Sequence, residues 1–339
     1  MKIAIHYREG NNFSPFWVEY CAKNKIDYKV VNCYSTNIIK ELTDCDFLLW
    51  HINNLNYKDQ VFAKGLMYAV HNMGIKTFPD FNTLWHFDDK IVQKYLFEGL
   101  GISLVPTYIF YDKVTALKWI EDVEFPKVFK LSKGSGSKGV LMCNNKQEAV
   151  KLTNKAFGKG FKTISAYFLF KERIRKYKLG KDNLVGVLKG FVRLFIGTEY
   201  INKAGREKNY IYFQDFMPKN EFDIRVIIIG NKAFGIKRMN RKNDFRASGS
   251  GNIIYDHLQI DLNIVKLSFE VNEKLKMQCA AFDFIYDSKG NPLIVEVSYG
   301  FNPKAYYECQ GYWDKNLKWT QAKINPQEWM VEDLIGNVE

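Results

Sequence analysis

Strand-forming and helix-forming segments alternate through the first eighty residues, and this alternation constrains the fold more than any other feature of the chain. Apolar, β-rich segments separated by amphipathic ones occur at 2–7, 28–33, 46–52 and 76–80, with the amphipathic segments at 16–24, 38–45 and 61–74. Strands joined by helices of this length form βαβ units and a parallel sheet. The sequence therefore predicts an α/β protein with a Rossmann-like N-terminal domain over residues 1–85.

The pattern changes after residue 86. Residues 86–213 contain strand patterns that flank a glycine-rich loop, and residues 214–339 contain longer strand patterns joined by short turns such as Gly230-Asn231. We expect two α+β subdomains over these ranges, with a basic insertion at about 165–208 in the first. Two or three domains are the usual number for a chain of 339 residues.

Composition excludes several classes of protein. The chain begins without the apolar stretch of a signal peptide, and no run approaches the roughly 18 apolar residues of a membrane span. Its six cysteines form no C-x-x-C pair, which is typical of free thiols in a reducing compartment. We therefore expect a cytoplasmic protein with no membrane span and no structural zinc; the sequence leaves a homodimer open.

The net charge of +12 is concentrated in one place. Residues 171–208, called the basic segment below, hold seven Lys and four Arg against four acidic residues. A basic chain suggests nucleic acid as a partner, but charge gathered in one insertion argues against nucleic acid. It favours a docking surface for an acidic substrate or carrier, and a solvated helical face is the alternative.

Gly134, Gly136 and Gly139 form a G-x-G-x-x-G motif between two strand patterns. A dinucleotide fingerprint requires a strand, the loop and then a helix, and a phosphate-binding P-loop requires Lys followed by Ser or Thr after the last Gly. Neither context is present here. Two interpretations remain: a flap whose backbone N–H groups close over nucleotide phosphates, with Lys130 on the leading strand, or a solvated hairpin tip.

Two carboxylates lie within apolar strand patterns, Asp283 in AAFDFIY and Glu296 in LIVEVSY. We expect them to face each other across a hairpin centred on residues 288–291. Oxygen ligands of this kind suit Mg²⁺, which would relieve the repulsion between them. The alternative is a buried carboxylate that pairs with arginine, because Arg225, Arg238 and Arg246 lie in neighbouring strand and loop patterns and suit phosphate or carboxylate capture.

Together these motifs resemble the ATP-grasp superfamily, which includes D-alanine–D-alanine ligase, glutathione synthetase and the ribosomal-protein glutamate ligases. The resemblance covers nearly the whole chain. It rests on DDK at 88–90, GISLVPT at 101–107, PKVFK at 126–130, FQDFMP at 213–218, DIRV at 223–226 and EVSY at 296–299. It implies an N-terminal βαβ domain followed by two subdomains that clasp ATP.

The resemblance also implies roles for single residues. Lys90 and Lys130 would contact ATP, with Ser135, Gly136 and Ser137 in the flap over the phosphates. The adenine hinge would comprise Gln214, Asp215 and Met217, with Glu221 on the ribose. Basic residues that hold phosphates and acyl-phosphate oxygens would be Arg225, Lys237, Arg238 and Arg246. The ligands of one or two Mg²⁺ ions, for which Mn²⁺ can substitute, would be Asp283 and Glu296. Ser298 stands where the family has Asn, so Ser298, Asn302 or a water would complete the set.

The implied activity is an ATP-dependent ligase that joins a carboxylate to an amine through an acyl phosphate and releases ADP and phosphate. One alternative is a phosphotransferase of the same fold, and another is a non-enzymatic binding module that uses the basic segment. We expect small-molecule or sugar-linked substrates, such as those of surface-polysaccharide biosynthesis. His51, Asn53 and Asn54 follow a parallel strand and are candidate substrate contacts. Tyr306, Tyr307, Tyr312 and Trp313 either line an acceptor pocket or cover the core.

Overall fold

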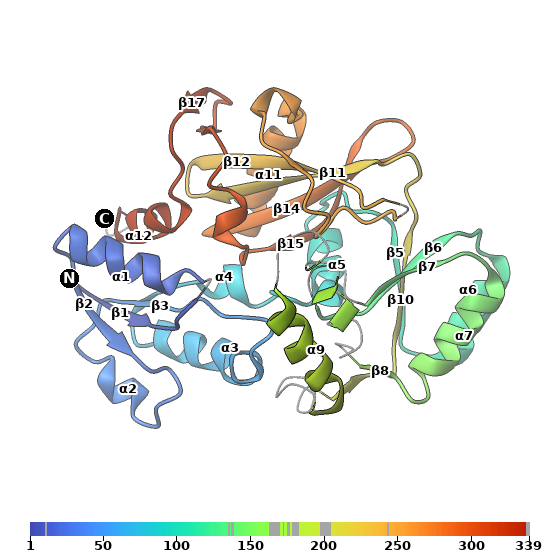
Figure 1. Ribbon diagram of the computed structural model, residues 1–339, viewed down its shortest axis with the longest axis horizontal. Coiled ribbons are helices and arrows are strands. Elements are labelled where there is room, and N and C mark those ends of the chain that lie inside the picture. Colours follow the sequence, from blue (N-terminus) through green and yellow to red (C-terminus); the bar gives the residue numbers. More distant parts are fainter. Residues whose placement is uncertain are drawn as a thin grey trace.

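A parallel sheet opens the fold, as the alternating pattern predicts. The computed structural model describes residues 1–10, 12–134, 136, 139–162, 170–171, 173–174, 177, 183–196, 205–242 and 244–336. Four strands pair in the order β2-β1-β3-β4. The elements of this domain are β1 (Lys2–His6), α1 (Ser14–Lys23), β2 (Asp27–Val31), α2 (Ile38–Glu41), β3 (Phe47–Leu49), α3 (Tyr57–His71), β4 (Lys76–Phe78) and α4 (Phe81–Leu84). The inner strands β1 and β3 are apolar and buried because helices flank them (Figure 1).

The small lobe, on the right in Figure 1, contains an antiparallel sheet in the order β5-β10-β6-β7. Its elements are α5 (Lys90–Gly99), β5 (Thr107–Phe110), α6 (Lys113–Asp122), β6 (Lys127–Lys130), β7 (Val140–Cys143), α7 (Lys146–Ala156) and β10 (Ile211–Asp215). A short pair, β8 (Phe161–Lys162) with β9 (Arg206–Glu207), and helix α9 (Leu184–Ile196) lie beside it. The border expected between residues 213 and 214 falls inside β10, because this strand completes the small-lobe sheet.

The C-terminal lobe is built on the sheet β15-β14-β11-β12-β16-β17, and β13 pairs with β12. Its elements are β11 (Phe222–Ile229), β12 (Lys232–Met239), β13 (Ile253–Ile254), η1 (His257–Gln259), α11 (Leu262–Leu275), β14 (Cys279–Tyr286), β15 (Pro292–Ser298), η2 (Pro303–Ala305), β16 (Gly311–Trp313), β17 (Trp319–Gln321) and α12 (Pro326–Gly336). The segment after α5 attaches to the edge of this sheet, where the Val105 N–H donates to the Ile294 carbonyl.

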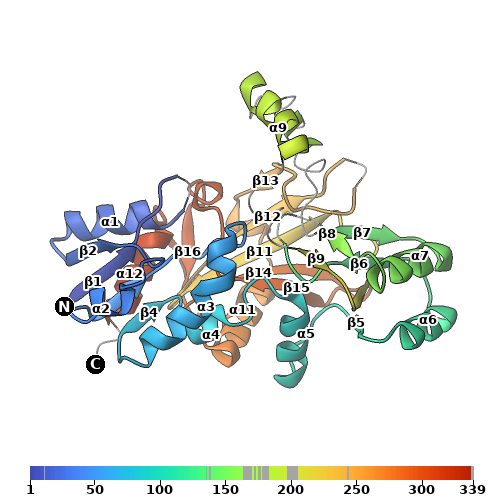
Figure 2. The same cartoon turned by 90° about the horizontal axis from the view of Figure 1, so that it is seen from below.

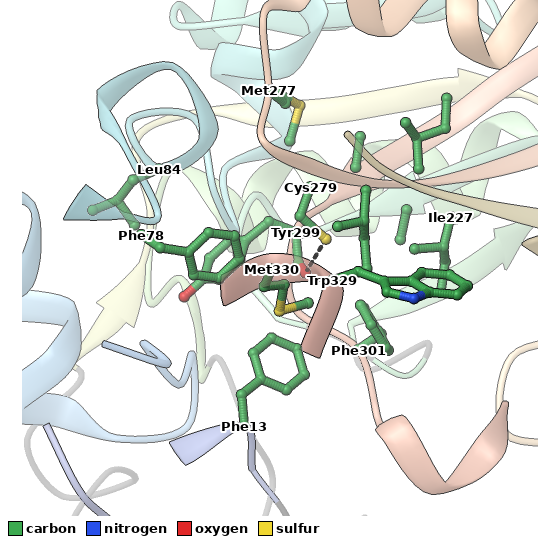
Figure 3. Close-up of a cluster of buried hydrophobic side chains, with 14 of the residues drawn as sticks. Phe13, Phe78, Leu84, Ile227, Met277, Cys279, Tyr299, Phe301, Trp329 and Met330 are labelled. Carbon is green, nitrogen blue, oxygen red and sulfur yellow. Dashed lines mark hydrogen bonds between the residues drawn. The ribbon is translucent and has the colours of Figure 1, made fainter. Parts of the chain in front are cut away.

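Among the described residues, the hydrophobic side chains form two cores, and the division between the cores differs from the division into the three larger sheets. One continuous core joins the N-terminal domain to the C-terminal lobe, with Phe13, Phe78, Tyr299 and Trp329 packed together (Figure 3). The Tyr299 hydroxyl accepts from the Ile52 N–H at 2.9 Å and donates to its carbonyl at 3.0 Å. The small lobe has its own core, around residues such as Phe129 and Phe213. The N-terminal domain and C-terminal lobe are therefore one packed body, against which the small lobe is set.

The aromatic tail belongs to the shared core. Tyr306 and Trp313 are buried, and the Tyr306 ring lies edge-to-face against Phe234 and Phe301. For these two residues the structure favours the covering role over the acceptor pocket. Among the described residues, no helix is long and apolar enough to cross a bilayer.

Candidate functional site

A cavity lies where the small lobe meets the C-terminal lobe. Strands β6 and β10 supply one wall, and β11, β14 and β15 supply the other. The predicted site residues that line it are Lys90, Lys130, Gly136, Gln214, Asp215, Met217, Arg246, Asp283 and Glu296. Lys90 and Glu296, the first and last of these residues in the sequence, are 206 positions apart. The fold thus brings distant parts of the chain together at one site.

Two lysines approach the cavity from the small-lobe side. Lys130 ends β6 and is 5% exposed, so burial lowers its pKa to about 8; Lys90 adds to this effect, while Glu296 and Asp283 oppose it. Lys90 follows the N-cap Asp89 of α5. Its Nζ donates to the Gly134 carbonyl at 2.8 Å and lies 3.7 Å from Glu296 Oε2. Lys90 therefore links the start of the glycine loop to the acidic strand.

The glycine loop is held at its first glycine. The Gly134 N–H donates to Asp88 Oδ1 at 3.0 Å, while the Gly134 carbonyl accepts from Lys90. The β6–β7 hairpin that carries the loop is antiparallel, with Lys130 opposite Val140, as a flap requires. Ser135 and Ser137, predicted to contact phosphate, lie outside the described residues.

The predicted adenine hinge follows β10. Gln214 is buried and its amide donates to Thr107 Oγ1 at 3.0 Å. The Asp215 N–H donates to the Pro106 carbonyl, and its carboxylate pairs with Lys127 Nζ at 2.6 Å. Within the part of the chain that the structure describes, the Met217 N–H donates to no acceptor. Met217 therefore has a backbone donor available to a planar base in the cavity, whereas the N–H of Asp215 is already engaged.

A network of two carboxylates and two guanidiniums crosses the floor between β14, β11 and β12. Arg225 binds both oxygens of Asp283, at 2.5 Å from Nε and Nη2. Arg238 binds both oxygens of Asp223 at 2.6 Å and lies 3.0 Å from Asp283 Oδ1. Burial alone would raise the pKa of Asp283, but Arg225 and Arg238 outweigh it and hold that pKa below its usual range. The arginine-paired alternative for Asp283 is thus the arrangement present.

Glu296 lies opposite Asp283 in the β14–β15 register, which confirms the predicted juxtaposition of the two carboxylates. The register shifts between Asp283 and Phe284, so a β-bulge places Val295 and Glu296 beside the cavity. The Glu296 side chain is 29% exposed, and Lys90 is its ion-pair partner among the described residues. The carboxylate oxygens of Glu296 thus remain available to the cavity, whereas those of Asp283 are largely occupied by arginines.

The donor set fits a hard divalent cation. Mg²⁺ commonly takes one or two carboxylates and fills its remaining positions with water and phosphate oxygens. Glu296 offers both oxygens, and Asp283 offers the lone pairs that its arginines leave. Ser298 lies on the same strand face as Glu296, and Asn302 lines the adjoining cavity with it. No group of three or more His, Cys, Asp or Glu residues suited to a metal occurs in the described ranges, so phosphate would have to complete the shell.

A second cavity adjoins the first and reaches the N-terminal domain. Lys90, Gly134, Gly136, Ser248 and Glu296 line both cavities. The second is also lined by His51, Asn53, Asn54, Asp88, Arg225, Ser298 and Asn302. The three candidates from the N-terminal domain are therefore brought to the site. Burial lowers the pKa of His51 to about 3, with Arg8 adding to the effect, so His51 is neutral.

Two of the predicted residues, Glu221 and Lys237, line neither cavity, and a third, Arg246, lines the first cavity but is already ion-paired. Glu221 is exposed and does not line either cavity, although its neighbours Asn220 and Phe222 line the first. Lys237 lies on the strand face opposite Arg238, because side chains alternate along β12, and its Nζ lies 4.0 Å from the centre of the Phe222 ring. Arg246 pairs with Asp244, and its Nη1 also donates to the Val140 carbonyl of β7. Arg246 thus joins the C-terminal lobe to the flap.

Sequence reasoning missed residues that hold the predicted ones in place. Asn220 binds the Met217 carbonyl through its amide, at 3.2 Å, and accepts from the Tyr286 N–H. Asp223 precedes Arg225 by two residues. On a strand this D-x-R spacing puts both side chains on one face, so the sequence did contain a signal that Asp223 lies beside the predicted arginine. Asp88, which accepts from the Gly134 N–H, lies beside Asp89, the N-cap of α5, in the D-D-K motif. No sequence pattern distinguished the roles of these two residues.

Comparisons with known proteins agree with this architecture. The family model of the RimK-like ATP-grasp domain matches residues 197–306. Alpha-aminoadipate–LysW ligase LysX from Saccharolobus solfataricus is 22% identical over 278 residues, which cover 81% of this chain and 84% of LysX.

Solved structures share the fold at lower identity. A RimK-domain ATP-grasp protein from Sphaerobacter thermophilus superposes with a TM-score of 0.57 at 10% identity, covering 99% of this chain and 100% of that one. D-alanine–D-alanine ligase from Bacillus anthracis gives 0.56 at 14% identity, covering 99% and 96%. The biotin carboxylase domain of 2-oxoglutarate carboxylase from Hydrogenobacter thermophilus, solved with MgADP, gives 0.60 at 13% identity, covering 99% and 70%. The chain thus has the ATP-grasp fold, and its residues 197–306 match the RimK-like ATP-grasp domain.

Proposed function

We propose that this protein activates a carboxylate with ATP and joins it to an amine where its two cavities meet. The observation that carries the proposal is their shared lining of Lys90, Gly134, Gly136, Ser248 and Glu296. Nucleotide in the first cavity would direct its terminal phosphate toward a carboxylate held in the second. A ligase needs such a junction, because two different substrates must react at one phosphoryl group.

Each basic residue has a distinct task in this proposal. Lys130, between the lobes, neutralises charge on the nucleotide phosphates, and Lys90 does so at the junction. Arg225 lines the second cavity and, fixed by Asp283, presents its guanidinium to the carboxylate substrate and then to the acyl phosphate. Arg238 holds Asp283 and Arg225 in register. Glu296 and Asp283 would hold a Mg²⁺ ion, for which Mn²⁺ can substitute, and the ion would supply further neutralisation of the phosphoryl oxygens.

Water must be kept from the acyl phosphate until the amine attacks. The β6–β7 flap covers the junction, and three contacts tie it to other elements, from Asp88, Lys90 and Arg246. No protein nucleophile is required, because the leaving phosphate makes the acyl group reactive. The amine attacks the acyl carbon, the tetrahedral intermediate expels phosphate, and ADP remains in the first cavity.

The second cavity indicates the kind of substrate. Its lining combines amide, hydroxyl and imidazole groups with the carboxylates of Asp88, Asp89 and Glu296. Such a lining suits a small, highly polar molecule, and sugar-linked acids or amines fit that description. The name of LysX gives LysW as one of the two molecules that it joins; for this chain an acidic carrier at the basic segment is a prediction that falls partly outside the described residues. Surface-polysaccharide biosynthesis has no support in the comparisons, so we assign no pathway.

The experiment that tests this function is a screen of carboxylic acids with Mg-ATP and hydroxylamine as a surrogate amine. An acyl phosphate gives a hydroxamate in amounts that match the ADP released. If ADP forms together with a stable phosphorylated product and no hydroxamate, the protein is a phosphotransferase and the ligase proposal is wrong. The Glu296→Gln variant controls for contaminating ATPases, because it should form neither product.

A further inference from the structure

Helix α9 exposes an unusual amount of apolar surface. It projects from the body of the molecule, as Figure 2 shows. Leu184, Val185, Leu188, Phe191 and Val192 are each between 49% and 58% exposed. At about 100° per residue these five positions form one continuous stripe along the helix. Scattered exposed apolar residues are ordinary, whereas a contiguous stripe marks an interaction site.

The opposite face of α9 is attached to the protein through glycines. Arg173 Nη1 donates to the Gly186 carbonyl at 2.9 Å. A Cβ added at Gly190 would lie 2.7 Å from Arg173 Cδ, so the close approach requires glycine there. The helix is therefore docked by its smallest residues and by the ring of Phe191, whose centre lies 5.8 Å from that of Phe170. More than half of the surface is exposed at the other four residues of the stripe, Leu184, Val185, Leu188 and Val192.

Charge completes the description of this surface. The stretch 183–198, which contains α9, has no acidic residue, and Lys189 is exposed beside the stripe. The whole basic segment carries seven Lys and four Arg against four acidic residues. An acidic carrier protein would match this charge but not the stripe. An anionic membrane offers both an apolar interior and negative headgroups next to it.

We propose that α9 lies in the surface of an anionic membrane and holds the protein there. The helix has 13 residues, about 20 Å at 1.5 Å per residue, which is too short for the roughly 30 Å hydrocarbon core. It therefore lies in the plane of the interface, with the stripe among the acyl chains and Lys189 among the headgroups. The stripe lines neither cavity, so this attachment is independent of the ligase chemistry.

The test is flotation of the full chain with vesicles of phosphatidylcholine, with and without phosphatidylglycerol. We expect binding to the anionic vesicles that weakens, without vanishing, in high salt, because apolar insertion is not screened. The double variant L188Q/V192Q should bind at least roughly tenfold more weakly. The matched control is V114Q/L258Q, which alters two residues that are 74% and 81% exposed on other elements and should bind as the unaltered chain does.

Three vesicle-binding results would each overturn the proposal. They are no binding to anionic vesicles, equal binding to neutral ones, and equal binding by L188Q/V192Q and its control. A concentration-dependent dimer that L188Q/V192Q abolishes would also overturn it, because a second copy would then cover the stripe. ADP release with soluble substrates should be the same in all these proteins. A failure of the ligase proposal would therefore leave this test intact.

Discussion

Asp283 and Glu296 face each other across two paired strands, yet their surroundings give them different tasks. Asp283 is enclosed by Arg225 and Arg238, and its side chain is 7% exposed. Glu296 has only the more distant Lys90 as its ion-pair partner among the described residues. Removing the first charge should therefore damage the fold, and removing the second should damage the chemistry.

Replacing Asp283 with Asn should destabilise the protein by about 3–5 kcal/mol, because the largely buried Arg225 loses its counter-charge, while Arg238 keeps Asp223. Since the folded state holds the pKa of Asp283 below its usual range, the stabilisation is complete above the unfolded pKa of about 3.9 and is lost as the pH falls below it. Urea unfolding at pH 7 and pH 3 measures both effects. Equal stability of the variant and the unaltered chain at pH 7 would contradict the ion-pair account.

Replacing Glu296 with Gln should lower the rate of ADP release by roughly 10²–10³-fold, the usual cost of losing one preorganised electrostatic group. The melting temperature should change little, because Glu296 is partly exposed and not enclosed by arginines. Steady-state kinetics with Mg-ATP checks the rate. Glu270→Gln, on the exposed face of α11, is the matched control and should leave the rate unchanged. A fully active Glu296→Gln variant would remove Glu296 from the site.

Lys130 should make ATP binding sensitive to alkaline pH. Its pKa in the free protein is about 8, and bound phosphates favour its charged form. Affinity should thus be full below pH 8 and should fall by up to about tenfold per pH unit above it. Titration calorimetry with ATP between pH 7 and pH 10 measures the slope. Lys130→Arg stays charged and should flatten this dependence, so an identical slope in the two proteins would rule out Lys130 as its source.

At the scale of elements, the β6–β7 hairpin controls access to the junction of the cavities. Gly139 ends its loop with φ +71°, and an added Cβ would lie 2.8 Å from Leu131 Cδ1. Gly139→Ala should therefore distort the flap and raise the KM for ATP several-fold with little loss of global stability. Gly65→Ala, on α3 with open space around it, is the control and should leave KM unchanged. An unchanged KM in Gly139→Ala would show that the loop tolerates the distortion.

The elements that carry the site could largely be predicted from the sequence, and others could not. Strands β6, β11, β14 and β15 are long apolar patterns with charged residues at regular positions, which fixed both their identity and the faces of Asp283 and Glu296. Helix α11 was missed, although its N-cap Asp261 and its apolar spacing were readable. The short strands β8, β13, β16 and β17 depend on tertiary pairing, which two or three residues cannot encode locally.

Side-chain partners were the least predictable level. Sequence placed Asp283 near several arginines but could not decide between a metal ligand and an ion pair, since both need the same residue types. Lys237 and Arg238 are adjacent and were both assigned to phosphates, yet strand alternation puts them on opposite faces. The faces follow from the pairing of β12 with its neighbours, which is a tertiary property.

At the scale of the whole molecule, the N-terminal domain and the C-terminal lobe share one core, and the small lobe has another. The first cavity lies on the boundary between these two bodies. We expect closure over nucleotide to move the small lobe, with Gly134 and Gly136 that line both cavities, against a fixed remainder.

Tyr299 tests the shared core. Its hydroxyl exchanges two hydrogen bonds with the backbone of Ile52 in the N-terminal domain. Tyr299→Phe leaves both buried backbone groups unpaired and should cost about 1–3 kcal/mol. In calorimetry of this variant, the N-terminal domain and the C-terminal lobe should still unfold in a single transition, at a lower melting temperature. If the N-terminal domain alone melted earlier, the two would be separate cooperative units.

The central claim is that a carboxylate is activated by phosphoryl transfer at the junction of the two cavities. The most direct measurement uses an acid that supports ADP release, labelled with ¹⁸O in both carboxyl oxygens, together with its amine. We predict that the phosphate released carries one ¹⁸O, because the acyl carbon gives up one carboxyl oxygen when the amine attacks. Phosphate free of ¹⁸O, formed alongside the amide product, would contradict the acyl-phosphate mechanism.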